Sequence, residues 1–204
     1  EFDFLILLTD VRVLKHEEQA TFTPVTNSVA GIGQPLLDAS DVFGSRGKLK
    51  GIISLGNVRE LETSSVAGRA AAMNLLLHEL GHQWSGTVKF ATPDGRLSDA
   101  LLRRPDREHW SHHVMWRSPL GGLGWRDNGN GTFTNTARLR EDEVRIFAPL
   151  DLYLMGLLPA VAVGELRYVT PAVAGQVGDE IAGTSTPVTM SQIIAANGQR
   201  RCEP

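Results

Sequence analysis

The sequence is poor in cysteine and in long apolar runs. Cys202 is the single cysteine among 204 residues, so no disulfide can form within the chain. No run of 18 apolar residues occurs, so we expect no transmembrane segment. An excess of one charge is also missing, because 20 Lys and Arg stand against 23 Asp and Glu. The net charge of −3 gives no general attraction for nucleic acid or anionic lipid, and we expect neither as a partner.

The chain has an otherwise ordinary globular composition. Hydrophobic residues make up 42% and charged residues 21%, enough for a core at this length. The first residue is Glu1 rather than methionine, and an apolar strand-like run follows almost at once. We therefore expect a processed piece of a longer protein, with any signal peptide already removed.

Local patterns predict short strands and helices in an α+β fold with a small mixed sheet. We expect strands at 2–9, 20–26, 51–55, 166–169 and 184–189, a hairpin at 125–134, and short helices at 149–156 and 190–197. The run at 2–9 has the composition of a buried strand, and Pro24 favours a sheet edge. We divide the chain into a core of residues 1–160 and a loop-rich C-terminal part of residues 161–204 packed on it, with a single domain as the alternative.

The strongest helix signal covers about residues 65–85. Ser64 or Ser65 can cap its N-terminus, and residues 67–80 are nearly all good helix formers. Gly86 stands where a glycine commonly ends a helix. Apolar residues surround most of the helix, so we expect it to be buried in the core.

Ionisable residues within this helix form the sequence His78-Glu79-Leu80-Gly81-His82. Residues four apart lie on one helix face, so the two imidazoles can share one metal ion. Zinc is the expected metal, because it binds imidazole nitrogen and keeps one position open in catalytic sites. Zinc lowers the pKa of a bound water toward about 7, and Glu79, beside the ligands, can remove its proton as general base.

Residues 78–84 resemble the active-site helix of the zincin metallopeptidases. This resemblance implies a zinc-dependent endopeptidase, with a short twisted sheet whose edge strand binds extended substrate; residues 51–55 are the expected counterpart of that strand. Residues 108–111 and 149–157 also resemble secreted bacterial zincin-like proteins, which implies a secreted or extracytoplasmic location.

One further zinc ligand must come from outside the helix, because catalytic zinc usually has three protein ligands. Ser85 and Val88 stand where the metzincin pattern has glycine and histidine, and Asp94 lies two positions beyond the acid of the aspzincin pattern. We favour His109, partly through the resemblance of its His-Trp-Ser stretch and partly because Trp110 can hold the imidazole by packing. The sequence leaves four alternatives open: Glu108, His112, His113 and Asp99.

Supporting roles are expected from the predicted helix at 149–156. Asp151 is an acid among apolar residues and can accept a hydrogen bond from a metal-binding histidine; the alternative is a first-turn acid that interacts with the helix dipole. Tyr153 is our candidate donor to the oxyanion that forms during hydrolysis. The other candidate donors are Tyr168, His112 and His113.

Two functions are compatible with these patterns. The first is hydrolysis of a peptide or protein substrate, and the second is an inactive zincin-like binding or adhesion module with a structural zinc ion. Glu79 favours the enzyme, because a structural site needs no general base. We do not expect calcium at residues 127–131, because the third position of that loop is glycine and a hairpin turn explains it.

Overall fold

The computed structural model describes residues 2–11, 19–136, 142–173 and 180–202. Helices and several small sheets are both present, so the α+β prediction is confirmed. Among the described residues, no helix combines the length and the apolar character that crossing a membrane would need.

The first sheet contains β1 (Phe4–Thr9), β6 (Gly51–Asn57) and β2 (Thr21–Pro24) in the order β1-β6-β2. β1 runs parallel to β6 and β2 runs antiparallel to it, which makes a small mixed sheet as predicted. The expectation that residues 51–55 form an edge strand is wrong, because β6 has a partner on each side. Pro24 does lie on an edge strand, as expected.

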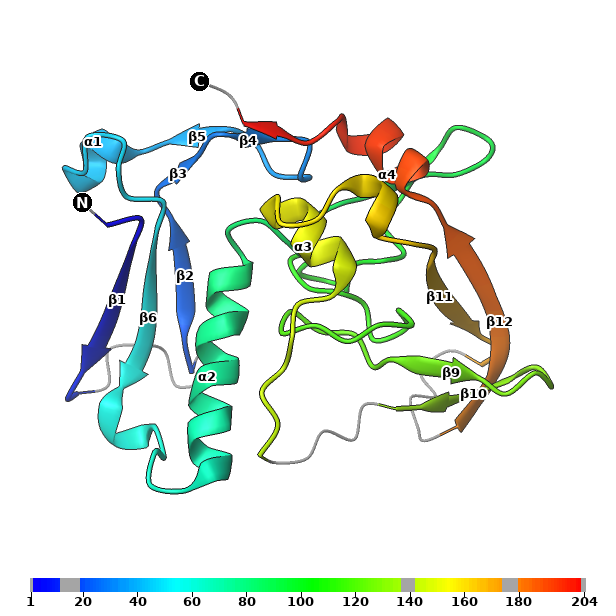
Figure 1. Ribbon diagram of the computed structural model, residues 1–204, viewed down its shortest axis with the longest axis horizontal. Helices are drawn as coiled ribbons and strands as arrows, with labels where there is room; N and C mark the ends of the chain where they lie inside the picture. Colours follow the sequence, from blue (N-terminus) through cyan, green and yellow to red (C-terminus); the bar gives the residue numbers. More distant parts are fainter. Residues whose placement is uncertain (1, 12–18, 137–141, 174–179, 203–204) are drawn as a thin grey trace.

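β1 is much less buried than its composition predicts. Its side chains from Leu5 to Leu8 are 41–52% exposed, although successive residues of a strand point to opposite faces. The expectation of a buried strand is therefore wrong. β1 pairs with β6 alone, which leaves it at the margin of the sheet (Figure 1).

The longest helix is α2 (Val66–Gly81), which packs against β6 and β2. The Ser65 hydroxyl accepts a hydrogen bond from the Gly68 amide and caps the helix, as predicted. His82 follows the last helical residue and keeps helical angles, with φ −61° and ψ −19°. It therefore lies one turn after His78 on the same side of the helix.

The prediction that this helix is buried is wrong for most of its length. Only Ala70, Glu79 and Gly81 are buried within α2, and Met73 is 45% exposed. The apolar composition identifies side chains that can be buried, but one flank of α2 borders a cavity instead of a second layer of the fold.

The remaining elements are short. They are β3 (Thr26–Asn27), β4 (Val29–Ala30), β5 (Leu37–Asp38), α1 (Ser40–Phe43), η1 (Val58–Glu60), β7 (Phe90–Ala91), β8 (Leu97–Ser98), β9 (Trp125–Asp127), β10 (Thr132–Asn135), α3 (Pro149–Met155), η2 (Ala160–Ala162), β11 (Leu166–Pro171), β12 (Glu180–Val188), α4 (Met190–Asn197) and β13 (Arg201–Cys202). β9 and β10 form the predicted hairpin, and α3 and α4 match the two predicted short helices.

Strands from the C-terminal part pair with earlier strands. The second sheet has the order β11-β12-β10-β9, and β13 pairs with β4. Backbone hydrogen bonds thus join the residues after 160 to the rest of the chain, while the division at residue 160 stays a prediction.

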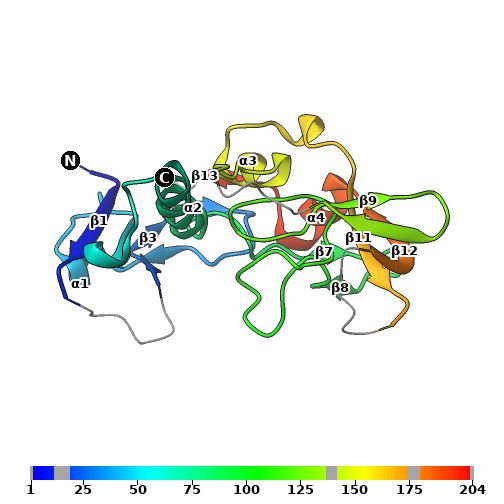
Figure 2. The same ribbon diagram turned by 90° about the horizontal axis from the view of Figure 1, so that it is seen from below.

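The main hydrophobic core lies away from α2. It gathers side chains of α3, α4, β7 and the long loop between β8 and β9, and its largest fully buried members include Trp110, Leu101, Leu120, Leu150, Leu154 and Ile193. Figure 2 shows the first sheet and α2 in one half of the molecule, and α3, α4 and the second sheet in the other. The loop that follows β8 brings His109 to the end of α2, at the candidate site.

Candidate metal centre

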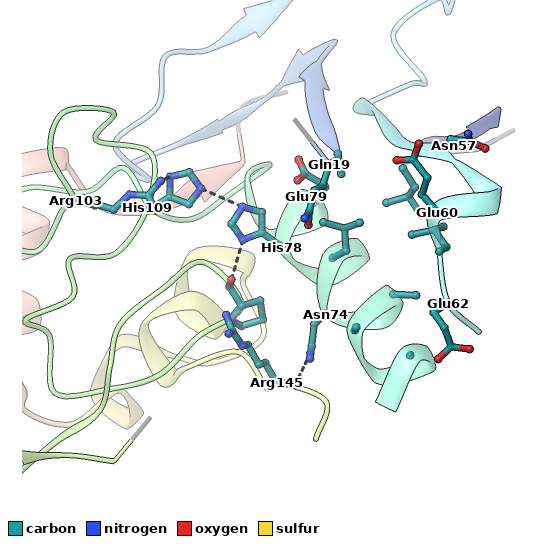
Figure 3. A pocket seen from close by; sticks show the side chains of 18 residues that line it. Gln19, Asn57, Glu60, Glu62, Asn74, His78, Glu79, Arg103, His109 and Arg145 are labelled. Carbon is teal, nitrogen blue, oxygen red and sulfur yellow. Dashed lines mark hydrogen bonds between the residues drawn. The ribbon is translucent and has the colours of Figure 1, made fainter. Parts of the chain in front are cut away.

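Three imidazoles converge where α2 faces the loop after β8, and Figure 3 shows two of them, His78 and His109. The ligand nitrogens of His78, His82 and His109 all lie within 4.8 Å of one another. Nε2 of His78 is 3.4 Å from Nε2 of His82 and 3.0 Å from Nε2 of His109. Nitrogens that share a tetrahedral zinc ion at 2.0–2.1 Å are about 3.3 Å apart. The cluster could therefore hold a metal ion, and its spacing fits a single one.

Nδ1 of His78 lies 2.9 Å from the Pro119 carbonyl oxygen. A carbonyl only accepts hydrogen bonds, so the proton of the neutral imidazole is on Nδ1. The Nε2 lone pair then faces the other two histidines. An imidazole that ligates a metal is normally oriented in this way by its second nitrogen.

His109 is oriented by charged neighbours in its own loop. Its Nδ1 lies 3.3 Å from Oδ2 of Asp106 and 2.9 Å from Nη2 of Arg103. Because a guanidinium only donates, Nδ1 accepts a hydrogen bond from Arg103 in the metal-free arrangement. A metal ion on Nε2 would place the proton on Nδ1, which would then donate to the Asp106 carboxylate instead. Arg103 donates to the same Asp106 oxygen from Nε at 2.9 Å, which holds the carboxylate in place.

The backbone that delivers His109 is fixed by its neighbour Trp110. Trp110 is fully buried, its amide donates to the Leu120 carbonyl at 2.9 Å, and its indole donates to Asp151 at 2.8 Å. The residue before His109 packs against Gly86, which follows α2. Gly86 has φ +84°, and a Cβ there would overlap the Glu108 carbonyl. A glycine is therefore needed where the chain leaving α2 meets the His109 loop.

The pKa values of all three histidines are lowered, which favours their neutral forms. Burial, followed by the neighbouring His78 and His109, lowers the pKa of His82 to about 3. Burial is also the main cause that lowers the pKa of His78 and that of His109. Neutral imidazoles at pH 7 keep the lone pairs that a metal ion needs.

Glu79 lies beside this cluster and is 6% exposed. Burial raises the pKa of its carboxyl to about 7, and no hydrogen bond to the carboxylate is found within the described part of the chain. A carboxyl group with a pKa near neutrality can both accept and return a proton.

A cavity of about 1070 Å³ runs along α2 past the cluster. His78, Glu79 and His109 line one end of it, and Glu60 and Glu62 line the end near the start of α2 (Figure 3). The site is thus open to a ligand of considerable length.

The alternative ligands lie outside the cluster. Asp99 pairs with Arg104 and Arg107 and so stabilises the loop. Glu108 and His112 are exposed. His113 is half-buried, and its Nδ1 has no hydrogen-bond partner within the described residues.

The two predicted supporting residues have other positions than expected. Asp151 accepts hydrogen bonds from Trp110 and from the Ala148 amide, and none from a described imidazole, so it acts one residue away from His109. Tyr153 lines a separate cavity of about 490 Å³, where its hydroxyl accepts from the Arg200 amide. The expectation that Tyr153 reaches the reacting group is therefore wrong, because Tyr153 does not line the cavity that His78, Glu79 and His109 line.

Sequence reasoning missed the residues that arrange the ligands. Asp106 and the Pro119 carbonyl carry no local pattern, and their roles follow from how the loop folds. Asn74 precedes His78 by four residues, so the spacing that identified His78 and His82 also places Asn74 on that face of α2. Arg145 lines the same end of the cavity and had no signal in the sequence.

Comparisons of the chain with models of protein families, with curated proteins and with solved structures find no match.

Proposed function

We propose that the protein is a zinc-dependent metalloendopeptidase of the zincin type, which hydrolyses peptide bonds in peptide or protein substrates. The observation that carries the proposal is the convergence of three imidazole nitrogens beside a buried carboxylate that has no hydrogen-bond partner among the described residues. Two of these imidazoles, His78 and His109, line one cavity together with the carboxylate of Glu79. The resemblance of residues 78–84 to the zincin active-site helix supports the same assignment.

The donor set suits zinc. His78, His82 and His109 offer three neutral nitrogens, and three protein ligands are typical of catalytic zinc, whereas structural sites commonly have four. When bound there, zinc supplies a Lewis acid that polarises a carbonyl and acidifies water.

Glu79 is the proton carrier of the proposed reaction. Its carboxylate takes a proton from the attacking water and returns it to the amine that leaves, and the raised pKa suits both steps near neutral pH. The long cavity along α2 provides room for a substrate segment next to Glu79. We further propose a secreted or extracytoplasmic location, which rests on the resemblance of residues 108–111 and 149–157 to secreted zincin-like proteins.

The test compares wild type with Glu79→Gln and with Glu108→Gln, which alters an exposed acid beside the His109 ligand. Each protein is loaded with zinc, analysed for metal content and incubated with a peptide library. We expect equimolar zinc in all three and cleavage by wild type and Glu108→Gln only. Full zinc loading without cleavage by wild type would instead favour the inactive binding module, and unchanged cleavage by Glu79→Gln would refute the role of the carboxylate.

A further inference from the structure

Asn74 fixes a second chain segment onto the metal-binding face of α2. Its side-chain Nδ2 donates to the Glu143 carbonyl at 3.0 Å. Its Oδ1 accepts from the Arg145 amide at 2.7 Å, and Figure 3 shows Asn74 beside Arg145. Because Asn74 precedes His78 by one turn on the same face, these two hydrogen bonds place Arg145 at the metal end of the cavity.

The guanidinium of Arg145 is close to the ligands and available. Arg103 and Arg145 both line the cavity together with His78 and His109 (Figure 3). Arg103 is already paired with Asp106. Arg145 is exposed and forms no ion pair with a described acidic residue.

The cavity is charged differently at its two ends. Arg145 lies at the end with the histidines, whereas Glu60 and Glu62 lie at the end near the start of α2. A ligand that carries one carboxylate is therefore repelled from the far end and attracted to the metal end. Arginine binds a carboxylate with two parallel hydrogen bonds, which gives orientation as well as affinity.

We infer that Arg145 is a specificity-determining residue that receives a carboxylate of the substrate next to the bond to be cleaved. This inference rests on the proposed function and narrows its substrate class to peptides with an acidic group at one position. The carboxylate belongs either to an aspartate or glutamate side chain or to a free C-terminus. Asn74 is the positioning residue that holds Arg145 in place.

The test measures binding, without turnover, to the zinc-loaded Glu79→Gln protein by fluorescence anisotropy. The probes are amidated, fluorescein-labelled peptides with one glutamate at successive positions, the same peptides with glutamine, and the glutamine peptides with a free C-terminal carboxylate. We expect glutamate at one position, or the free C-terminus, to tighten binding about tenfold over the amidated glutamine peptide. Which probe gains affinity distinguishes the two sources of the carboxylate.

Further substitutions in the Glu79→Gln protein test whether Arg145 causes the preference for a carboxylate. Arg145→Gln should abolish the preference, Arg145→Lys should restore part of it, and Arg126→Gln, which removes an exposed cation of β9 outside the cavity lining, should leave it intact. Zinc content should be unchanged in all of them. A preference that survives Arg145→Gln, or the absence of carboxylate-dependent binding at every position, overturns the inference. Cleavage by wild type is scored separately, so a failure of the proposed function is recognised independently.

Discussion

The indole of Trp110 donates a 2.8 Å hydrogen bond to the carboxylate of Asp151, and both side chains are fully buried. The pair joins α3 to the loop that carries His109. Burial raises the pKa of Asp151, while its hydrogen bonds from Trp110, Ser118 and Ala148 oppose that shift. The residue next to His109 is thus held by a buried acid that belongs neither to the histidine cluster nor to the lining of the cavity beside it.

Replacement of Asp151 by alanine should destabilise the fold and weaken zinc binding together. The change leaves the buried Trp110 and Ala148 donors without an acceptor, at a cost of about 2–4 kcal/mol. Denaturant unfolding of the metal-free protein measures the first effect, and a zinc titration measures the second. Asp151→Asn keeps one oxygen acceptor and should be milder; wild-type stability of Asp151→Ala would contradict this role.

His109→Ala should reduce zinc affinity by about 100-fold or more, because it removes a ligand rather than a residue that supports one. Circular dichroism should show an intact fold. His112→Ala and His113→Ala are the matched controls from the same loop, and both should bind zinc like wild type. If His109→Ala retains wild-type affinity, the third ligand lies elsewhere, and Glu108 is the next residue to test.

Asp106→Asn should lower zinc affinity about 10–100-fold, the usual effect of removing a carboxylate that supports a ligating histidine. The substitution also releases Arg103, so Arg103→Gln serves as the control that removes the other half of the ion pair. A competitive chelator titration distinguishes the two. Equal effects of both substitutions would show that the ion pair, rather than the carboxylate on His109, is what matters.

The metal-free protein should lose stability as pH rises from about 4.5 to 7 because of Glu79. Its pKa is about 7 when folded against an ordinary 4.5, so the folded state binds the proton more tightly and folding weakens once that proton is lost. Glu79→Gln should therefore stabilise the metal-free protein at pH 8, on the order of 2 kcal/mol, and have little effect at pH 4. Thermal melts of both proteins across this range give the comparison, and a difference independent of pH would refute it.

The histidines act in the opposite direction. Folding lowers their pKa values, so the unfolded state binds protons more tightly than the folded state. For His82, whose folded pKa is about 3, the free energy of unfolding therefore decreases as the pH falls from about 6.5 toward 3. Wild type and Glu79→Gln both contain these histidines, so the difference between their stabilities at each pH isolates the contribution of Glu79.

Local spacing was sufficient to predict α2 and the placement of His78 and His82 on one face of it, because helix geometry is set over a few residues. His109 was favoured because a third ligand was needed and because its His-Trp-Ser stretch resembles that of secreted zincin-like proteins. Strand order was not readable: whether β6 lies at the centre or at an edge depends on β1 and β2, which pair with it across the chain. Asp106, Asn74 and Arg145 gain their roles from how distant backbone segments meet.

Burial was the least predictable property. The apolar residues of β1 and α2 can be buried, but their sequences do not say whether another layer covers them. β1 has a partner on one side only, and α2 has the first sheet on one flank and the cavity on another.

The three histidines come from distant parts of the chain: His78 lies in α2, His82 directly follows α2, and His109 lies on the loop after β8. An ion held by all three would therefore close a loop of the chain between His78 and His109, which are 31 positions apart in the sequence. Like any cross-link, it restricts the unfolded chain, and its binding free energy adds to that of folding. The protein should consequently be most stable with the metal ion bound. A chelator should then lower the free energy of unfolding as well as inhibit the protein.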